Sequence, residues 1–287
     1  MLAIYKKEMR TYFTSIVGYL FLGFFLALIG LYFYAQNLYS ASPNFGYALG
    51  GVMMFFILLV PMVTMRIMAE ENKQKTDQLL YTSPLSVTKI ILGKYLSILS
   101  MFGIVMLITC IYPPILSKYG TVNYKMSYAC ILAFFLMGAA YMAIGLFISS
   151  VTESQAFAAI MTFVVVILSV FATQIAELLP TTAKTAWLLF SVLLLGIAWL
   201  TYVLMHNITV SIAFALLVEI ALFALYRIKP DALEGSLLNV FGWFSISDRF
   251  VNFAYGEFDV AAIVYYISYF VLFVFLTIQA IKKNRWS

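Results

Sequence analysis

The charged residues of this chain gather in one stretch, and their types limit the chemistry it could perform. Residues 66–94 hold eight of the 29 charged side chains in about a tenth of the 287 residues. Arginine, lysine, aspartate and glutamate are all present, so ion pairing and contact with another protein are the functions that this composition favours. The alternative interpretation is a solvated loop that merely joins two membrane spans.

Motifs for catalysis or nucleotide hydrolysis are missing from the sequence. Gly93-Lys94 is followed by Tyr95, so no GxxxxGK[ST] phosphate loop exists and ATP cannot be held by that route. His206 is the one histidine and cannot build a zinc site alone, and neither HExxH nor GxSxG occurs. Glu70-Glu71 with Lys75 resembles the EExxxR of intramembrane proteases only weakly, since those enzymes also need histidines. We expect no catalytic residue, metal or cofactor in this chain.

Two helices and a turn should position the charged stretch. The front half has helical character, and Thr82-Ser83-Pro84 should end that helix because proline lacks an N–H. Ser86 is suited to cap a second, short helix. A polar helix–turn–helix between two apolar segments would form a handle outside the membrane.

The rest of the chain is apolar enough to live in lipid. It is 64% hydrophobic and 10% charged, whereas soluble domains carry about 25% charged residues. We expect an all-α polytopic membrane protein with one transmembrane domain over residues 1–287. About eight spans of roughly 20 residues fit the sequence. They are 16–35, 46–68 with a kink at Pro61, 95–116 closed by Pro113-Pro114, 127–149, 155–177, 186–205, 208–226 and 258–281.

The segments outside these spans have their own character. Residues 2–15 alternate charged and apolar groups, as in an amphipathic interfacial helix that turns its apolar side to lipid. The pair 186–226 has a very tight break at His206-Asn207 and could be re-entrant instead of spanning. With both termini in the cytoplasm, eleven of the 17 lysines and arginines lie on that side, which favours this orientation. We therefore expect a multi-pass protein of the plasma membrane.

Some polar and small residues lie within the predicted spans. Glu219 lies mid-span, where a carboxylate costs about 2.5–3.5 kcal/mol. It could relay protons, or it could be protonated or hydrogen-bonded to a neighbour such as Gln174 or His206. Gly46 with Gly50, and Gly145 with Ser149, form small-xxx-small pairs that allow helices to approach closely.

The charged stretch and the tail carry a family resemblance. The run EENKQKTDQLLYTSPLSVTKIILGKYLS resembles the cytoplasmic loop of type-2 ABC exporter permeases, in particular the gliding-motility and nitrous-oxide-reductase-maturation branch. The matching residues are Glu70, Glu71, Lys75, Thr76, Leu79, Leu80, Ser83, Pro84, Ile91 (or Ile90), Gly93 and Lys94. In the tail they are Asp248, Arg249, Phe250, Phe253, Gly256, Asp259 and Tyr265. The family core has six spans, so residues 186–226 would be an added helical pair.

The resemblance implies the membrane subunit of an ATP-driven exporter, which forms the translocation path and docks separate ATPases that bind ATP and Mg. Docking or coupling would involve Glu70, Glu71, Thr76, Pro84, Ser86, Lys89, Gly93 and Lys94. Residues 227–257 would form an outer re-entrant segment with Trp243, Arg249 and Phe250.

The expected partners are ABC ATPase subunits, a second permease copy or a homologous permease, an accessory membrane or extracytoplasmic subunit, and the lipid bilayer, but no nucleic acid. The path would lie between two permeases. The alternative function is a stand-alone secondary carrier or channel that uses Glu219, with Gln174 as a second polar intramembrane residue.

Overall fold

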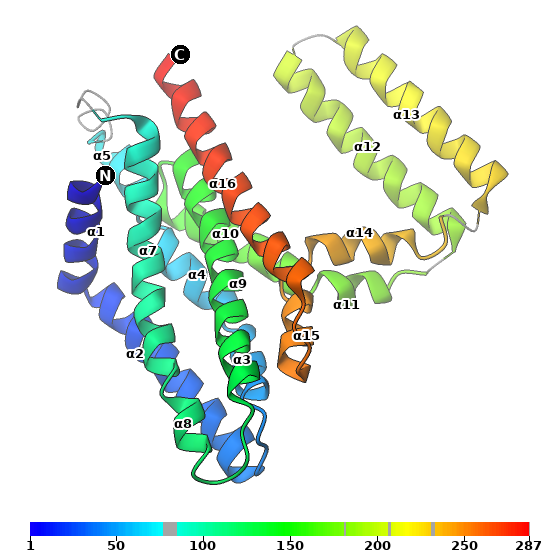
Figure 1. Cartoon of the computed structure of the whole chain (residues 1–287). Coiled ribbons are helices and arrows are strands. Elements are labelled where there is room, and N and C mark those ends of the chain that lie inside the picture. The colour runs from blue at the N-terminus through cyan, green and yellow to red at the C-terminus, as the bar shows by residue number, and fades with distance from the viewer. Residues whose placement is uncertain (77–84, 181, 206–207, 231–232, 287) are drawn as a thin grey trace. The chain divides into compact units, whose positions relative to one another are not determined.

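The computed structural model describes residues 1–76, 85–180, 182–205, 208–230 and 233–286. Every regular element in these ranges is a helix, which confirms the expected all-α class. The chain packs as two compact units (Figure 1). Unit 1 is Met1–Val170 with Ile246–Ser287, and unit 2 is Phe171–Ser245. That both units belong to a single transmembrane domain stays a prediction.

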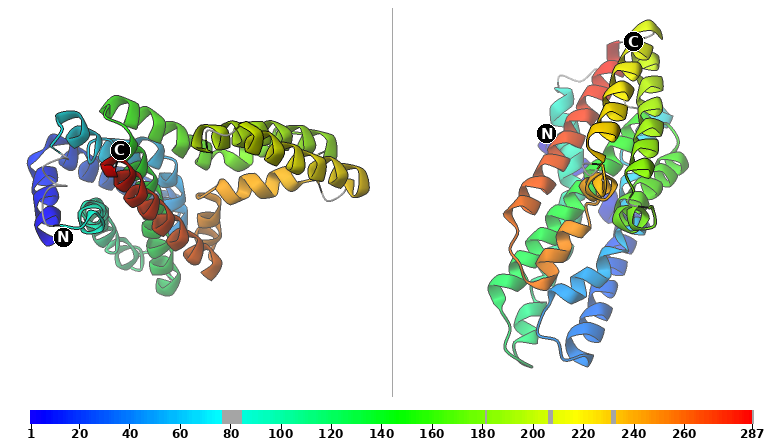
Figure 2. Two further views of the ribbon diagram at one scale, coloured as in Figure 1. Left: turned by 90° about the horizontal axis from the view of Figure 1, so that it is seen from above. Right: turned by 90° about the vertical axis from the view of Figure 1, so that its right-hand side faces the viewer.

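Unit 1 contains most of the apolar helices. Their bounds, in chain order, are α1 Leu2–Thr14, α2 Ile16–Tyr32, the π-helix η1 Phe33–Tyr39, α3 Gly46–Met53, α4 Phe56–Thr64, α5 Ala69–Gln74, α7 Val87–Thr109, α8 Tyr112–Leu116, α9 Tyr124–Val151, α10 Gln155–Val170, α15 Asp248–Tyr255 and α16 Val260–Trp286. Figures 1 and 2 place both chain ends at the same end of unit 1, and Figure 1 shows α5 at this end as well.

Four helices in the described part of the chain are long and apolar enough to cross a membrane, namely Ile16–Tyr39, Val87–Leu116, Tyr124–Val151 and Val260–Lys283. The bent segment formed by α3 and α4 gives a fifth if it counts as one span. α10 is a shorter apolar helix of 16 residues. These helices confirm a polytopic membrane protein, whereas the count of eight spans stays a prediction.

The structure corrects the expected bend in the second span. The chain turns by 64° at the break between Met53 and Phe56, whereas Pro61 lies inside α4. Around the break, the Phe55 N–H donates to the carbonyl of Val52, only three residues back, so the turn tightens there. Gly50-Gly51 lies one turn earlier and weakens the helix, because glycine gains the most conformational freedom on unfolding.

The third span also differs from the prediction. Ser86 occupies the N-cap position, as expected, but its side chain makes no capping hydrogen bond. The helix that it starts is not short, because α7 runs without a break from Val87 to Thr109. The span ends at Leu116, as predicted. Pro113-Pro114 does not end its long helix, since α7 stops at Thr109 and both prolines lie at the start of α8, where the first N–H groups have no helical partner in any case.

An aromatic cluster forms the centre of unit 1. Phe25, Phe56, Phe102, Phe134 and Phe250 are all fully buried and come from α2, α4, α7, α9 and α15 respectively. Ring centroids lie 5.0 Å apart for Phe56 and Phe134, and 5.4 Å apart for Phe134 and Phe250. Buried aromatic pairs contribute about 0.5–1.5 kcal/mol beyond their area. Phe250, expected in an outer segment, is therefore a core residue that fastens α15 to α9.

Both small-xxx-small pairs lie at helix crossings, which confirms the interpretation that they serve packing. A Cβ placed on Gly46 would lie 2.7 Å from the carbonyl oxygen of Ala254 on α15. A Cβ placed on Gly145 would collide with the Thr64 side chain on α4. The missing side chains thus let α3 approach α15 and let α4 approach α9.

Unit 2 consists of α11 Ala172–Glu177, α12 Ala183–Met205, α13 Ile208–Ile228 and α14 Ser236–Phe244. The predicted added pair 186–226 corresponds to α12 and α13, which lie side by side in both figures. A small apolar core of Ala183, Ala186, Leu233 and Leu237 joins the start of α12 to α14. His206-Asn207 lies outside the described residues, and whether this pair spans the membrane or is re-entrant stays a prediction.

The residues of the predicted outer segment 227–257 are divided between the units, with α14 in unit 2 and α15 in unit 1. That they form an outer re-entrant segment stays a prediction. The division falls at Ser245-Ile246, where unit 1 satisfies the backbone: the Ile246 N–H donates to Ser169 Oγ, and Tyr266 donates to the Ile246 carbonyl. Buried polar backbone needs such partners in lipid.

Candidate functional site

α5 is the helix in the front half of the charged stretch. A side chain of α9 is hydrogen-bonded to its first turn. Ser149 Oγ lies 3.2 Å and 3.1 Å from the backbone N–H groups of Met68 and Ala69 and accepts from both. It also donates to the Met65 carbonyl at 3.2 Å. Because the first N–H groups of a helix lack internal partners, this hydroxyl acts as a cap supplied by a distant part of the chain.

The other side of α5 is fixed in the same way. Asn72 donates from Nδ2 to the carbonyls of Ser150 and Thr152, at 3.3 Å each, where α9 ends. α5 then stops at Gln74, because Lys75 takes a left-handed conformation with φ 56°. The predicted stop at Thr82-Ser83-Pro84 comes later in the chain and lies outside the described residues.

The cap leads to a prediction for Ser149→Ala. Loss of an N-cap hydroxyl costs about 0.5–2 kcal/mol, so hydrogen–deuterium exchange of residues 68–74 should accelerate about tenfold. Ser150→Ala is the matched control, since Ser150 Oγ donates only to the Phe147 carbonyl within α9. Equal exchange rates in both variants would show that Ser149 does not hold α5.

A cluster of four charges, with Lys94 buried at its centre and Lys7 exposed at its edge, joins three helices, and we call Lys7, Glu8, Glu71 and Lys94 the ionic cluster. Lys94 is 1% exposed, and its ammonium lies 2.9 Å from Glu8 on α1 and 2.8 Å from Glu71 on α5. A third bond of 2.8 Å reaches the Ile67 carbonyl, so all three N–H donors are used. Lys7 lies 2.6 Å from Glu71. Two cations thus balance two carboxylates.

The ionic cluster perturbs the titration of its outer pair. Burial alone would raise the pKa of Glu71, but the Lys94 charge and hydrogen bonds from Lys7 and Lys94 outweigh it and hold that pKa below its usual value. Burial alone would lower the pKa of Lys7, but its hydrogen bond to Glu71 and the Glu71 charge raise it. Both side chains are therefore charged at neutral pH.

Gly93 allows α1 to lie directly on α7. A Cβ at this position would come within 3.1 Å of the Met1 carbonyl oxygen and 3.3 Å of the Ile4 Cβ. A larger residue would push α1 outward and pull Glu8 away from Lys94. These contacts and the ionic cluster join the charged stretch to the N-terminal helix.

The predicted docking residues fall into two groups. Glu71, Gly93 and Lys94 face α1 and can act on a partner only by bracing the surface around them. Ser86 and Lys89 are exposed on the first turn of α7. Glu70 is half-buried and pairs with Arg66 at 3.0 Å, and the half-buried Thr76 donates its N–H to the Glu71 carbonyl at 3.1 Å. Pro84 lies outside the described residues.

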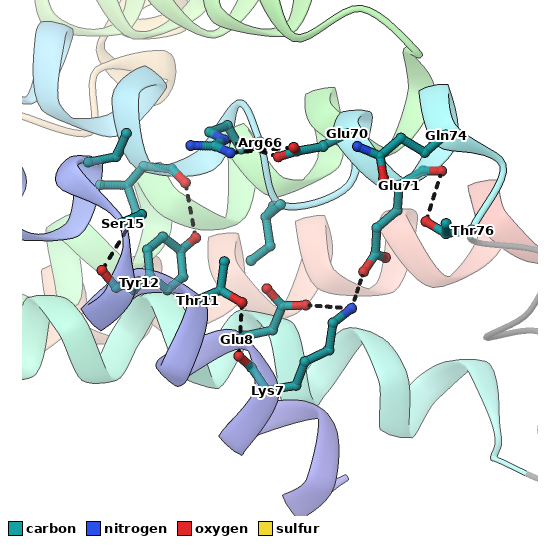
Figure 3. Close-up of a pocket in the computed structure, with 13 residues that line it drawn as sticks. Lys7, Glu8, Thr11, Tyr12, Ser15, Arg66, Glu70, Glu71, Gln74 and Thr76 are labelled. Atoms are coloured by element: carbon teal, nitrogen blue, oxygen red, sulfur yellow. Dashed lines mark hydrogen bonds and ion pairs between the residues drawn. The ribbon is translucent and has the colours of Figure 1, made fainter.

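A polar cavity of about 340 Å³ flanks α5 on the side of α1. Figure 3 shows Lys7, Glu8 and Glu71 turned toward one another at this cavity, with the Arg66–Glu70 pair nearby. Tyr12 also lines it and donates to the Val63 carbonyl at 3.1 Å. The cavity, the exposed turn of α7 and the surface of α5 form a polar platform at one end of unit 1.

The remaining predicted residues lie elsewhere. Glu219 Oε1 accepts from Trp187 Nε1 at 3.1 Å and from Ser191 Oγ at 2.9 Å, which ties α13 to α12. The expected partner Gln174 lies on α11 and accepts from Thr173, and His206 lies outside the described residues. Hydrogen bonding of Glu219 to a neighbour is thus observed, with different partners, and a proton-relay role stays a prediction.

The predicted outer residues are divided between the two units. Arg249 lies in unit 1 at the start of α15, with its guanidinium carbon 4.0 Å from the centroid of the Tyr265 ring, a cation–π geometry. Trp243 lies on α14 in unit 2 and is 66% exposed.

Sequence reasoning missed Glu8 and Ser149. Glu8 sits between Ile4 and Tyr12 at four-residue spacing, so all three share one helical face, and that face is the buried one. An acidic residue in the middle of an apolar stripe was therefore a readable signal. Ser149 was singled out only as a small residue, and its capping role depends on a long-range contact.

One comparison with known proteins identifies relatives of this chain. Residues 34–228 match the family described as ABC-2 family transporter protein. The match covers η1 from its second residue, the α3–α4 segment, α5 and the helices through α13, whereas α1 and α2 precede it. No curated protein matches the chain.

Proposed function

Because the chain belongs to the ABC-2 family of transporter proteins, and is thus a permease component of an ABC transporter, we propose that it serves an ATP-driven exporter. Separate ATPase subunits, which bind ATP and Mg, would dock on the polar platform around α5 and the first turn of α7. The sequence has no phosphate loop of its own, so the work must enter through a protein contact.

The ionic cluster is the observation that carries this proposal. It fixes α1, α5 and the start of α7 to one another through bonds of 2.6–2.9 Å. A partner that presses on any one of these helices would therefore move all three together. Glu71, Gly93 and Lys94 would brace the contact, and Glu70, Thr76, Ser86 and Lys89 would form it, with Pro84 in the connecting turn.

The platform would face the cytoplasm. Both chain ends and α5 lie at the same end of unit 1 (Figure 1), and this end carries Lys6, Lys7, Arg10 and the lysines of residues 66–94. An excess of lysine and arginine is typical of cytoplasmic loops. In the plasma membrane, both termini would then be cytoplasmic.

Other parts of the proposal rest on the family's organisation. A second copy, or a homologous permease, would complete the translocation path, and an accessory membrane or extracytoplasmic subunit would extend it. We assign the chain to the gliding-motility and nitrous-oxide-reductase-maturation branch, on the motif residues in the charged stretch and the tail. α15, with Arg249, would belong to the outer re-entrant segment.

Charge reversal on the platform tests the docking. Lys73→Glu with Lys89→Glu changes two exposed side chains and should weaken copurification of the ATPase about tenfold or more, because rim charges steer association. Lys118→Glu with Lys125→Glu is the matched control, since these exposed lysines flank the α8–α9 connection at the other end of unit 1. Equal ATPase recovery from both variants would exclude docking on this platform.

The carrier or channel alternative makes a different prediction. Ion flux through the purified chain alone in liposomes, abolished by Glu219→Gln, would support that function and contradict the exporter. The hydrogen bonds of Glu219 to Trp187 and Ser191 join two helices, and we therefore expect no such flux.

A further inference from the structure

The N-terminal helix α1 presents three different faces. Ile4, Glu8 and Tyr12 are buried against unit 1. The sequence had suggested that the apolar side of this helix turns to lipid, yet Ile4 and Tyr12 contact protein instead. Any lipid-facing residues of α1 therefore lie on its other sides.

A second, apolar face of α1 is exposed. Leu2 and Phe13 are 67% and 38% exposed. They are eleven residues apart, which is close to three full helical turns, so they lie on one side. The Phe13 ring makes an edge contact with Tyr19 of α2, with centroids 6.4 Å apart, and Ile16 is 81% exposed. The apolar face of α1 thus continues into the exposed surface of a candidate membrane span.

A third face, next to the apolar one, carries two exposed cations. Lys6 and Arg10 are exposed and one turn apart. Within the described ranges neither side chain has an ion-pair partner, whereas Lys7 is bonded to Glu71. At 100° per residue, Lys6 lies next to the apolar face and Arg10 one step further round. Exposed apolar and basic strips side by side are typical of helices in the headgroup region of a bilayer.

The contacts of α1 also suit that position. Its first residues touch Gly93, six residues into α7, and its Tyr12 hydroxyl reaches Val63 near the end of α4. α1 therefore crosses from one helix to the other close to where both leave the apolar part of the chain. Charged side chains on a helix at this level would be within reach of lipid headgroups.

We propose that α1 binds anionic phospholipid headgroups, with Lys6 and Arg10 against the phosphates and Leu2 and Phe13 among the upper acyl carbons. Anionic leaflets attract basic residues near the surface. An acidic surface of a partner protein is the competing occupant of the basic strip. It fits less well, because the adjacent apolar face is continuous with the exposed side of α2. This inference does not rest on the proposed function.

Lipid titration of the purified full-length chain, without any partner protein, tests the proposal. Native mass spectrometry would compare retention of phosphatidylglycerol and phosphatidylcholine with matched acyl chains. Lys6→Gln with Arg10→Gln should reduce the preference for phosphatidylglycerol by roughly 30-fold, about fivefold for each cation. Lys73→Gln with Lys75→Gln removes the same charge at the same end of unit 1 from two other exposed positions, and should leave the preference within about twofold of the wild-type value.

Two outcomes would overturn the proposal. The first is an unchanged preference in the Lys6→Gln, Arg10→Gln variant; if that variant also reduces copurification of the ATPase, the basic strip belongs to the partner protein. The second is an equal loss of preference in the control pair. Since both substituted side chains are exposed, the thermal unfolding temperature should match the wild type and exclude misfolding as the cause of any loss.

Discussion

Lys94→Met should lower the free energy of unfolding by about 3–5 kcal/mol, because removing one partner of a buried ion pair leaves the other charges uncompensated. Glu8 and Glu71 would then share only the Lys7 ammonium, which is 3.8 Å from Glu8. The Ile67 carbonyl would lose its bond as well. Thermal unfolding of the detergent-purified chain measures the loss.

Two further variants make this prediction specific. Lys89→Met removes the same side chain five residues earlier on α7 at an exposed position, and should change stability by less than about 0.5 kcal/mol. Adding Glu71→Gln to Lys94→Met should recover part of the loss, because one unpaired carboxylate disappears. If Lys94→Met unfolds at the wild-type temperature, the ionic cluster does not hold α1, α5 and α7 together.

Gly46→Ala should destabilise unit 1 by about 1–3 kcal/mol through overpacking. The new Cβ would lie 2.7 Å and 2.8 Å from the Ala254 carbonyl oxygen and Cα. These are backbone atoms, so the clash is relieved only by moving α15. Asn44 donates to the same carbonyl at 2.6 Å, and this bond would lengthen too. Thermal unfolding and faster hydrogen exchange in α15 report the effect.

Gly50→Ala is the matched control one turn along α3. Its Cβ would lie 3.9 Å from the Ala254 Cβ, an ordinary contact. Alanine also favours the helix over glycine by about 1 kcal/mol. The control should therefore be neutral or slightly more stable than the wild type. A destabilisation equal to that of Gly46→Ala would mean that the close approach at Ala254 is not the cause.

The helices were predictable because a long apolar run in lipid must satisfy its backbone N–H and C=O groups within the run itself, as a helix does. The position of Ser86 at a helix start and the packing role of Gly46 and Gly145 followed from local chemistry, and the structure confirms them. The bend at Met54-Phe55 did not follow. The prediction placed the bend at Pro61, because proline is the usual cause of a kink. The chain turns instead just after Gly50-Gly51, where the helix is weakest.

Ion pairs between residues far apart in the sequence were also not predicted. Lys94 meets Glu8, which lies 86 residues away in the sequence, and a single sequence does not determine such a pairing. For the same reason, the sequence alone does not show that residues 227–257 are divided between the two units. Whether α14 and α15 pack together depends on which surfaces each one buries, and those surfaces belong to helices that come much earlier in the chain.

α7 is straight, whereas the α3–α4 segment is bent, and this difference has a mechanical consequence. α7 is an unbroken rod of 23 residues, about 34 Å long at 1.5 Å per residue. The limb formed by α3 and α4 has a joint of 64° in the middle. Lys94, seven residues after the start of α7, donates to the Ile67 carbonyl, which lies three residues after the end of α4. A displacement applied at Lys94 would pass along the whole of α7 without a change of direction. In the α3–α4 segment it would change direction at the bend, so the two segments would slide past each other.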